Sequence, residues 1–238
     1  MKIAHTACTD LGLVRTANED YFRLLPGIGL FILADGMGGA RGGGFASRLA
    51  ADTVAEEMMK IPKPDASSLM AAVELAHQEV RAAALRDPAL NGMGTTLIAA
   101  LVEGNDVAIV SVGDSRAYRF GSGVFDLITE DQTWVQEVGI PLGLSEAALR
   151  THPMRHRLTM AVGIDADLES RYYGTSLTTG EGILLSSDGL HGLVYETRLN
   201  GIVNQGTMAL EQRCQELIRA AKEGGGTDNI TAVMIEGV

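Results

Sequence analysis

The sequence has few of the features that mark secreted or membrane-spanning proteins. It contains two cysteines, Cys8 and Cys214, which are too few for a disulfide framework and which lie among small or apolar residues. We therefore expect buried free thiols and a reducing, cytoplasmic setting. No apolar run approaches the roughly 18 residues of a membrane span, and we expect no signal peptide because the N-terminus lacks an apolar segment.

Positive charge is also scarce, since 19 Lys and Arg residues face 30 Asp and Glu residues and the net charge is -11. Such a chain has no general electrostatic attraction to nucleic acid or to an anionic membrane, so we expect neither as a partner. The surplus carboxylates have two interpretations: a soluble acidic surface, or a cluster neutralised by bound cations. Hydrophobic residues make up 46 % of the chain, enough for a substantial core, so disorder is not expected.

Several catalytic motifs are absent as well. Neither cysteine has the C-x5-R spacing of cysteine-dependent phosphatases: Cys8 to Arg15 is one residue too long, and Cys214 to Arg219 is one too short. The 29 glycines include no G-x-G-x-x-G, and there is no G-x-x-x-x-G-K-[ST] phosphate loop. No H-E-x-x-H occurs, and the five histidines do not cluster as zinc ligands.

Hydrophobic periodicity predicts a mixed fold. No repeat or linker divides the chain, so we expect one domain over residues 1–238. Helices are predicted at about 44–59, 66–85, 132–138 and 207–223. Strands are predicted at 29–34, 95–102, 106–112, 116–120, 124–128, 158–162, 170–176, 182–187 and 229–236. The four strands between 95 and 128 read as an antiparallel meander, and the whole pattern favours an α+β layered sandwich.

Four aspartates recur where these strands stop or start: Asp35, Asp114, Asp188 and Asp228. Because strand ends meet at one edge of a layered sheet, the four carboxylates could converge. Anionic oxygens held close together repel unless hard cations lie between them, and oxygen ligands suit Mg²⁺ or Mn²⁺. The alternative is that Asp-Gly and Asp-Asn pairs are ordinary turn formers. An aspartate between apolar strands is costly unless it is paired or metal-bound, which favours the metal interpretation.

Arg15 stands shortly before Asn18, Glu19 and Asp20. One interpretation is a structural ion pair between the guanidinium and neighbouring carboxylates. The other is phosphate recognition, because the guanidinium can donate two parallel hydrogen bonds to a phosphate. The sequence leaves both interpretations open.

Seven short motifs follow one another along nearly the whole chain. They are Gly12-x-x-Arg15-x-x-Asn18-Glu19-Asp20, Asp35-Gly36-Met37-Gly38-Gly39, Gly94-Thr95-Thr96, Gly113-Asp114-Ser115-Arg116-x-Tyr118, Leu158-Thr159-x-Ala161-Val162-Gly163, Ser187-Asp188-Gly189-Leu190 and Asp228-Asn229-Ile230-Thr231. In this order they resemble the metal-dependent PPM, or type 2C, protein phosphatase family in its compact bacterial form. The resemblance implies a central antiparallel β-sandwich flanked by helix pairs, in four α-β-β-α layers.

The resemblance also implies the chemistry, which is hydrolysis of phosphoserine and phosphothreonine in proteins at a binuclear Mn²⁺ or Mg²⁺ centre. It implies that Asp35 bridges the two metal ions and that Asp188 and Asp228 complete the ligands of the first. The carbonyl of Gly36 would bind the second ion, with Glu19 holding it directly or through water.

Further roles follow from the same resemblance. Asp114, together with Asp188, matches the place where bacterial relatives hold a third, weaker metal ion. Arg15 would bind the substrate phosphate, and Asp20 would order the water around the metals. The resemblance implies a phosphoprotein substrate, a bacterial Ser/Thr kinase as the opposing enzyme, and a monomer.

Three positions depart from the family pattern. Met37 replaces a histidine that many eukaryotic relatives carry, and methionine cannot act as an acid. Gln132 stands where bacterial relatives commonly have histidine, and His156 stands where asparagine is more usual. The last two lie in residues 131–157, which match the mobile flap of bacterial members. Two alternatives to a protein phosphatase are a phosphatase of small phosphoesters and a non-catalytic binding domain.

Overall fold

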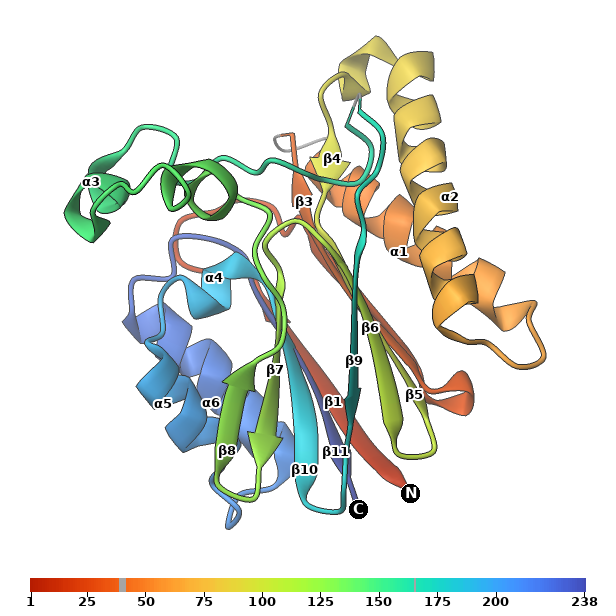
Figure 1. The fold of residues 1–238 in the computed structure, drawn as a ribbon, viewed down its shortest axis with the longest axis vertical. Helices are drawn as coiled ribbons and strands as arrows, with labels where there is room; N and C mark the ends of the chain where they lie inside the picture. The colour runs from red at the N-terminus through yellow and green to blue at the C-terminus, as the bar shows by residue number, and fades with distance from the viewer. Residues whose placement is uncertain (39–41, 165) are drawn as a thin grey trace.

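Two antiparallel β-sheets stacked face to face form the centre of the molecule (Figure 1). The computed structural model describes residues 1–38, 42–164 and 166–238. The first sheet has the order β1 (Ile3–Asp10), β11 (Ile230–Gly237), β10 (Glu181–Ser186), β7 (Arg116–Gly121) and β8 (Val124–Leu127). The second has the order β2 (Asp20–Leu25), β3 (Leu30–Met37), β5 (Leu97–Glu103), β6 (Asp106–Val112) and β9 (Arg171–Ser176), and β4 (Gly94–Thr95) pairs with the end of β3.

Helices cover both outer faces of this sandwich (Figure 1). The pair α1 (Gly43–Met59) and α2 (Ala66–Arg86) packs on the second sheet, and α4 (Asp188–His191), α5 (Glu196–Val203) and α6 (Leu210–Glu223) pack on the first. Short 3-10 turns occupy Pro26–Ile28 and Pro88–Leu90. A π-helix at Val135–Gly139 and α3 (Glu146–Thr151) form the flap, which projects from one end. No helix in the described part of the chain is long and apolar enough to span a membrane.

The apolar residues divide into three cores, one between the sheets and one beneath each helix layer. Strand β3 shows why its sequence is apolar without alternation. Ile32 faces the helices α1 and α2, whereas Phe31 and Leu33 face the other sheet. Since successive side chains of a strand point to opposite faces, a strand covered on both faces needs apolar residues throughout. The predicted α+β sandwich with flanking helix pairs is therefore confirmed.

The predicted helices at 44–59, 66–85 and 207–223 are confirmed, and their apolar stripes face the cores. The predicted meander at 95–128 is wrong, because β5 and β6 belong to one sheet and β7 and β8 to the other. The predicted strand at 158–162 is also wrong. Only the isolated bridges at Leu158 and Val162 form there, and Gly163, with φ of 91°, turns the chain away.

Other elements were not anticipated. Most residues of strands β1 and β2 are half-buried, so their burial shows no clear period of two. Each strand lies at the edge of its sheet, β1 in the first and β2 in the second. Helices α4 and α5, which follow β10, are short and have no long apolar stripe that could predict them. Helix α3 lies within residues 139–157, for which no helix was predicted. Strand β3 continues through Asp35 and Gly36 to Met37, because β4 supplies backbone partners there.

Candidate functional site

The predicted aspartates come from both sheets and meet at one end of the sandwich. Asp35, near the end of β3, is the register partner of Asp20, the first residue of β2. Asp188 begins α4 directly after β10, and Asp228 stands just before β11. Asp114 lies in the connection between β6 and β7, which passes from one sheet to the other. The fold therefore gathers carboxylates from distant parts of the sequence.

These carboxylates lie close enough to raise one another's pKa, and Asp20 is buried whereas Asp35, Asp114, Asp188 and Asp228 are half-buried. Burial raises the pKa of Asp35 well above its usual value, and the charges of Asp20 and Asp188 raise it further. Burial, followed by the charges of Asp188 and Asp131, raises the pKa of Asp114 to about 7. Burial also raises the pKa of Asp20 to about 6, even though two hydroxyl groups oppose the shift. A bound cation would relieve this repulsion directly.

Two carboxylate oxygens in this cluster are buried and have no hydrogen-bond partner among the described residues: Asp20 Oδ1 and Glu19 Oε1. The other oxygen of Asp20, Oδ2, accepts hydrogen bonds from Ser187 Oγ at 2.8 Å and Thr231 Oγ1 at 2.6 Å. Buried polar atoms are rarely left unpaired without a reason such as an ion or a catalytic role. The free oxygens and the hard-oxygen ligand set therefore fit a divalent cation.

Glycines allow the start of α1 to approach the cluster. A Cβ atom on Gly36 would lie 2.2 Å from the carbonyl oxygen of Gly43, and one on Gly43 would lie 2.8 Å from the carboxylate of Glu19. Gly36 also donates its backbone N–H to the Glu19 carbonyl at 3.2 Å. Glycine at both positions thus brings Glu19 and the Gly36 backbone together. Gly39, the last residue of the Asp35 motif, lies outside the described residues.

Arg15 lies at the exposed side of the cluster. Its Nη2 donates to Asp228 Oδ2 at 2.6 Å, and the Arg15 side chain is 49 % exposed. The hydrogen bond to Asp228 raises the pKa of Arg15, and the charges of Glu19 and Asp188 add to that effect. The ion pair therefore joins Arg15 to the far end of the sequence, and the exposed guanidinium is within reach of a ligand at the cluster.

Among the described residues, no group of three acidic, histidine or cysteine side chains is already arranged to hold a metal ion. The carboxylates instead face protein partners: Asp228 contacts Arg15, and Asp20 contacts Ser187 and Thr231. The charges of Asp20, Asp188, Asp114 and Asp228 all raise the pKa of Asp35, which places these carboxylates near one another.

Comparison with known proteins decides the family. Residues 14–223 match the family described as Protein phosphatase 2C. The Serine/threonine phosphatase stp of Listeria monocytogenes is 33 % identical, over 96 % of this chain and 93 % of its own length. The Serine/threonine protein phosphatase PstP of Mycobacterium tuberculosis is 34 % identical, over 98 % of this chain and 45 % of its own length. The chain belongs to the protein phosphatase 2C family.

Solved structures agree with this membership. The catalytic domain of PstP, crystallised in complex with two manganese ions, matches at a TM-score of 0.84 with 34 % identity, covering 98 % of this chain and 97 % of that one. PppA, a regulatory component of the type VI secretion system in Pseudomonas aeruginosa, matches at a TM-score of 0.85 with 28 % identity, covering 100 % and 99 %. This chain is a metal-dependent protein serine/threonine phosphatase.

Several residues that support the site of this phosphatase have roles that the sequence did not reveal. Asn229 accepts a hydrogen bond from the backbone N–H of Glu19 at 2.8 Å and donates to the carbonyls of Leu11 and Ala17. It thereby fixes the loop that carries Arg15 against the start of β11. Asn229 belongs to one of the seven motifs, so its presence was the available signal, but its partners were not predictable.

Two threonines hold Asp35 in place. Thr96 Oγ1 accepts from the backbone N–H of Asp35 at 3.0 Å and shares a 2.8 Å hydrogen bond with Ser115 Oγ, and Thr95 Oγ1 donates to the Asp35 carbonyl at 2.8 Å. Ser115 follows Asp114 directly, so this chain of hydrogen bonds links Asp35 to the crossover between the sheets. The Gly94-Thr95-Thr96 motif thus positions metal-binding candidates without itself supplying a ligand.

Gln132 is a buried clamp at the base of the flap, only 1 % exposed. Its Oε1 accepts from the backbone N–H of Gly113 at 2.8 Å, and its Nε2 donates to the carbonyl of Glu169 at 2.7 Å. Its own backbone N–H donates to the Gly113 carbonyl at 3.0 Å and its carbonyl accepts from Thr159 at 2.9 Å. An amide that donates and accepts at once therefore holds the turn next to Asp114.

The remaining departures from the family pattern lie differently. His156 is exposed on the flap, whereas Met37 is half-buried and its methyl group lies 2.8 Å from where a Cβ atom of Gly94 would stand. Within the flap, the ring of Trp134 stacks on that of His152 with centroids 3.9 Å apart. Gln132 therefore has a structural role, whereas His156 is exposed to solvent.

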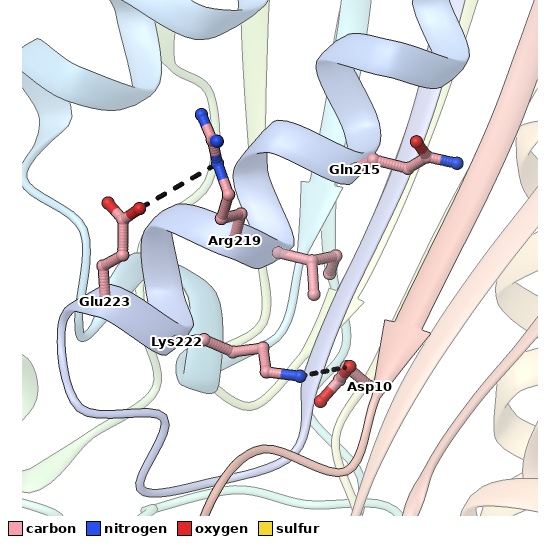
Figure 2. Close-up of a pocket in the computed structure, with 6 residues that line it drawn as sticks. Asp10, Gln215, Arg219, Lys222 and Glu223 are labelled. Carbon is pink, nitrogen blue, oxygen red and sulfur yellow. Dashed lines mark hydrogen bonds and ion pairs between the residues drawn. The ribbon is translucent and has the colours of Figure 1, made fainter.

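A surface hollow of about 450 Å³ runs along α6 (Figure 2). It is lined by Asp10, Gln215, Ile218, Arg219, Lys222 and Glu223. Two ion pairs border the hollow. Lys222 Nζ lies 2.9 Å from Asp10 Oδ2, and Arg219 Nε lies 3.9 Å from Glu223 Oε1 on the same helix. Its described lining residues include none of the predicted site residues, so this hollow is separate from the carboxylate cluster.

Proposed function

We propose that the carboxylate cluster is the binuclear metal centre of this phosphatase. Asp35 would bridge the two ions, Asp188 and Asp228 would complete the first ion's ligands, and the Gly36 carbonyl with Glu19 would hold the second. The observation that carries this proposal is a set of buried and half-buried, mutually repelling carboxylates in which Glu19 Oε1 and Asp20 Oδ1 have no partner among the described residues. Hard oxygen ligands of this kind suit Mn²⁺ and Mg²⁺.

Once bound, two divalent cations supply a water of lowered pKa and positive charge for the phosphoryl oxygens. The residues of the chain contribute the rest. Asp20, fixed by Ser187 and Thr231, keeps one free oxygen to accept a proton or orient a water. Arg15 would move from Asp228 to the substrate phosphate, where its two terminal nitrogens can donate in parallel. No side-chain nucleophile is implied, so no phosphoenzyme is expected.

Asp114 is the candidate ligand for a third ion. It is half-buried at the crossover between the sheets, and the charge of Asp188 contributes to its raised pKa. A site that shares Asp188 with the first ion but has fewer carboxylates should bind more weakly. We propose Mn²⁺ as the cation used first, by analogy with the two manganese ions of the PstP structure, with Mg²⁺ as a substitute.

The broader biological role is proposed by the same analogy. The named relatives are serine/threonine phosphatases, so we propose a phosphoprotein substrate and an opposing Ser/Thr kinase in a cytoplasmic signalling circuit. The net charge of -11 argues against nucleic acid or an anionic membrane as a partner. We also propose that residues 1–238 act as one monomeric domain, with residues 131–157 as a substrate-facing flap.

The test is a rate comparison under metal control. Purified protein is stripped with EDTA and assayed on a phosphothreonine peptide and on a small aryl phosphate, with Mn²⁺, with Mg²⁺ and with EDTA alone. The proposal predicts turnover of both with either metal, a higher kcat/KM on the peptide and no turnover in EDTA. Full activity in excess EDTA would contradict a metal centre. A higher kcat/KM on the aryl phosphate would favour small phosphoesters as substrates.

A further inference from the structure

The two cysteines of the chain lie against each other, although they are 206 positions apart in the sequence. Cys8 belongs to β1 and is the register partner of Ala232 in β11. Cys214 belongs to α6, and its Sγ lies 3.6 Å from the carbonyl oxygen of that same Ala232. Cys8 also packs against the apolar core that contains Cys214. Strand and helix therefore present their thiols to the same point.

The environments of the two thiols differ. Cys214 is fully buried, whereas Cys8 is half-buried on β1, which is the edge strand of its sheet. The hydrogen bond between the thiols lowers the pKa of Cys8 to about 7, against the opposing effect of burial. The same contact, followed by burial, raises the pKa of Cys214. A partly accessible thiol with a lowered pKa beside a second thiol is the usual arrangement of a reacting and a resolving cysteine.

The hollow shown in Figure 2 is lined by residues close to both cysteines in the sequence. Asp10 of its lining lies two residues after Cys8, on the same face of β1. Ile218 lies one helical turn after Cys214, on the same face of α6. The hollow therefore lies beside the packing of β1 on α6 in which the thiols meet. The expectation of two buried thiols holds for Cys214, whereas Cys8 is half-buried.

We propose that Cys8 and Cys214 form an oxidation site of this phosphatase, which a hydroperoxide converts into an intramolecular disulfide joining β1 to α6. In the first step the Cys8 thiolate attacks a peroxide oxygen, the O–O bond breaks, and Cys8 becomes a sulfenic acid while the peroxide is reduced to water or an alcohol. In the second step the Cys214 sulfur attacks the Cys8 sulfur. The S–O bond breaks, and the departing hydroxide takes the Cys214 proton to form water.

The proposed disulfide would join the two elements that lead into the carboxylate cluster. Strand β1 leads directly into the loop of Arg15, and α6 leads into the loop of Asp228. These loops already contact each other, since Leu13 N donates to Gly226 O at 2.7 Å, and Lys222 at the end of α6 pairs with Asp10 at the end of β1. A covalent bond between Cys8 and Cys214 would fasten together the two elements from which these loops emerge. It would also remove freedom from the unfolded chain, which stabilises the folded state.

The experiment treats the folded, full chain with a small excess of hydrogen peroxide and then measures thiols and mass. We expect both thiols to disappear, the intact mass to fall by about 2 Da, and a peptide pair linking residues 8 and 214 to appear without reductant. Because the chain has two cysteines, any intramolecular disulfide is this one. Dithiothreitol should restore both thiols, and the oxidised protein should melt at a higher temperature than the reduced protein.

Single substitutions provide matched controls. Cys214→Ala keeps the half-buried thiol, so peroxide should give a sulfenic acid at Cys8 that dimedone traps. Cys8→Ser keeps the buried thiol and should lose neither its remaining thiol nor mass at the same dose. Circular dichroism checks that each variant folds. The proposal is overturned if peroxide leaves both wild-type thiols intact, gives only sulfinic or sulfonic acid at Cys8, or gives only disulfide-linked dimers.

Discussion

The carboxylate cluster and the 131–157 flap lie at the same end of the sandwich but are held in place by different means. Asp35 sits in a strand whose backbone pairs with β2 on one side, and Thr95 and Thr96 fix its backbone groups. The flap contains a π-helix and the short helix α3, with no sheet pairing beyond the bridge between Thr133 and Leu158 in the described chain. The cluster is thus part of the rigid sheets, whereas the flap is attached to them.

Backbone hydrogen bonds of Gln132 and a few side-chain contacts make that attachment. Arg116 makes two hydrogen bonds to Asp131, at 2.8 and 2.7 Å, and Arg171 contacts Glu137 at 2.5 Å. Gln132 adds its clamp to Gly113 and Glu169. Because a loop anchored at its base can change without disturbing the sheets, we expect metal chemistry and substrate choice to be separable in this phosphatase. Substitutions in the two regions should therefore have different consequences.

The largest effect is expected from Asp35→Asn, which keeps the shape of the side chain but removes the proposed bridging charge. Bound metals supply several kcal/mol of transition-state stabilisation, so turnover should fall about 10³-fold or more on peptide and aryl phosphate alike. Steady-state rates at saturating Mn²⁺ measure this. A folded, metal-loaded variant with near wild-type rates on either substrate would remove Asp35 from the metal centre.

Arg15→Ala should have the next largest effect. Losing a charge-assisted contact of about 1.5–3 kcal/mol raises KM for a phosphopeptide by roughly 10- to 100-fold, while the metal core remains intact. Arg15→Lys is the matched control, because it keeps the charge but loses the two-pronged geometry. If both variants keep wild-type kinetics and Arg15→Ala only melts earlier, the contact with Asp228 is a structural ion pair and nothing more.

Gln132→Met tests the connection between the two regions. It leaves the Gly113 N–H and the Glu169 carbonyl without their partners, which costs about 1–3 kcal/mol each in unfolding free energy. Because the turn beside Asp114 loosens, we expect kcat to fall about tenfold, as for other residues that orient metal ligands. Gln132→Glu keeps the acceptor and should lose less. The free energy of unfolding in urea and kcat are measured for the same variants. If the free energy of unfolding falls while kcat is unchanged, Gln132 does not orient the turn beside Asp114.

The smallest effect on chemistry is expected from Trp134→Ala in the flap. Loss of the stack on His152 should lower phosphoprotein turnover several-fold and leave aryl phosphate turnover nearly unchanged. The competing interpretation makes Trp134 a simple core anchor. In that case both rates would fall equally and the melting temperature would drop, so measuring all three quantities distinguishes the two.

Sequence reasoning succeeded where local patterns determine structure. The apolar run before Asp35 and the stripe of α2 predicted their elements because burial on one or both faces leaves a periodic trace. The family motifs then predicted which aspartates would gather. Strand β1 left no such trace, since as an edge strand its side chains are half-buried on most positions. The sequence could predict the carboxylate cluster because each of its aspartates lies in a recognisable local motif.

The supporting contacts could not be predicted in this way. Gln132 meets Gly113, Glu169 and Thr159, and Cys8 meets Cys214, only after distant elements have packed. In the sequence Gln132 was only a departure from the family pattern, but its amide serves as a donor and an acceptor in a buried position. Such roles depend on three-dimensional neighbours, for which a single sequence has no periodic signal.

One measurement tests the central claim, that these carboxylates are a metal centre. It follows the melting temperature from pH 5 to pH 8, once in excess EDTA and once in excess Mn²⁺. The pKa values of Asp114 and Asp20, raised to about 7 and about 6, exceed the usual value near 3.9 of an unfolded chain. The folded metal-free protein therefore binds more protons than the unfolded chain between about pH 4 and 7, so its stability should fall as pH rises through that window.

With Mn²⁺ bound, the sign should reverse. Protons compete with the cation for the carboxylates, so stability should rise with pH, and the two curves should diverge toward pH 8. Asp35→Asn should lose most of the stability gained from Mn²⁺. Parallel curves with no stabilisation by Mn²⁺ at any pH would contradict the account.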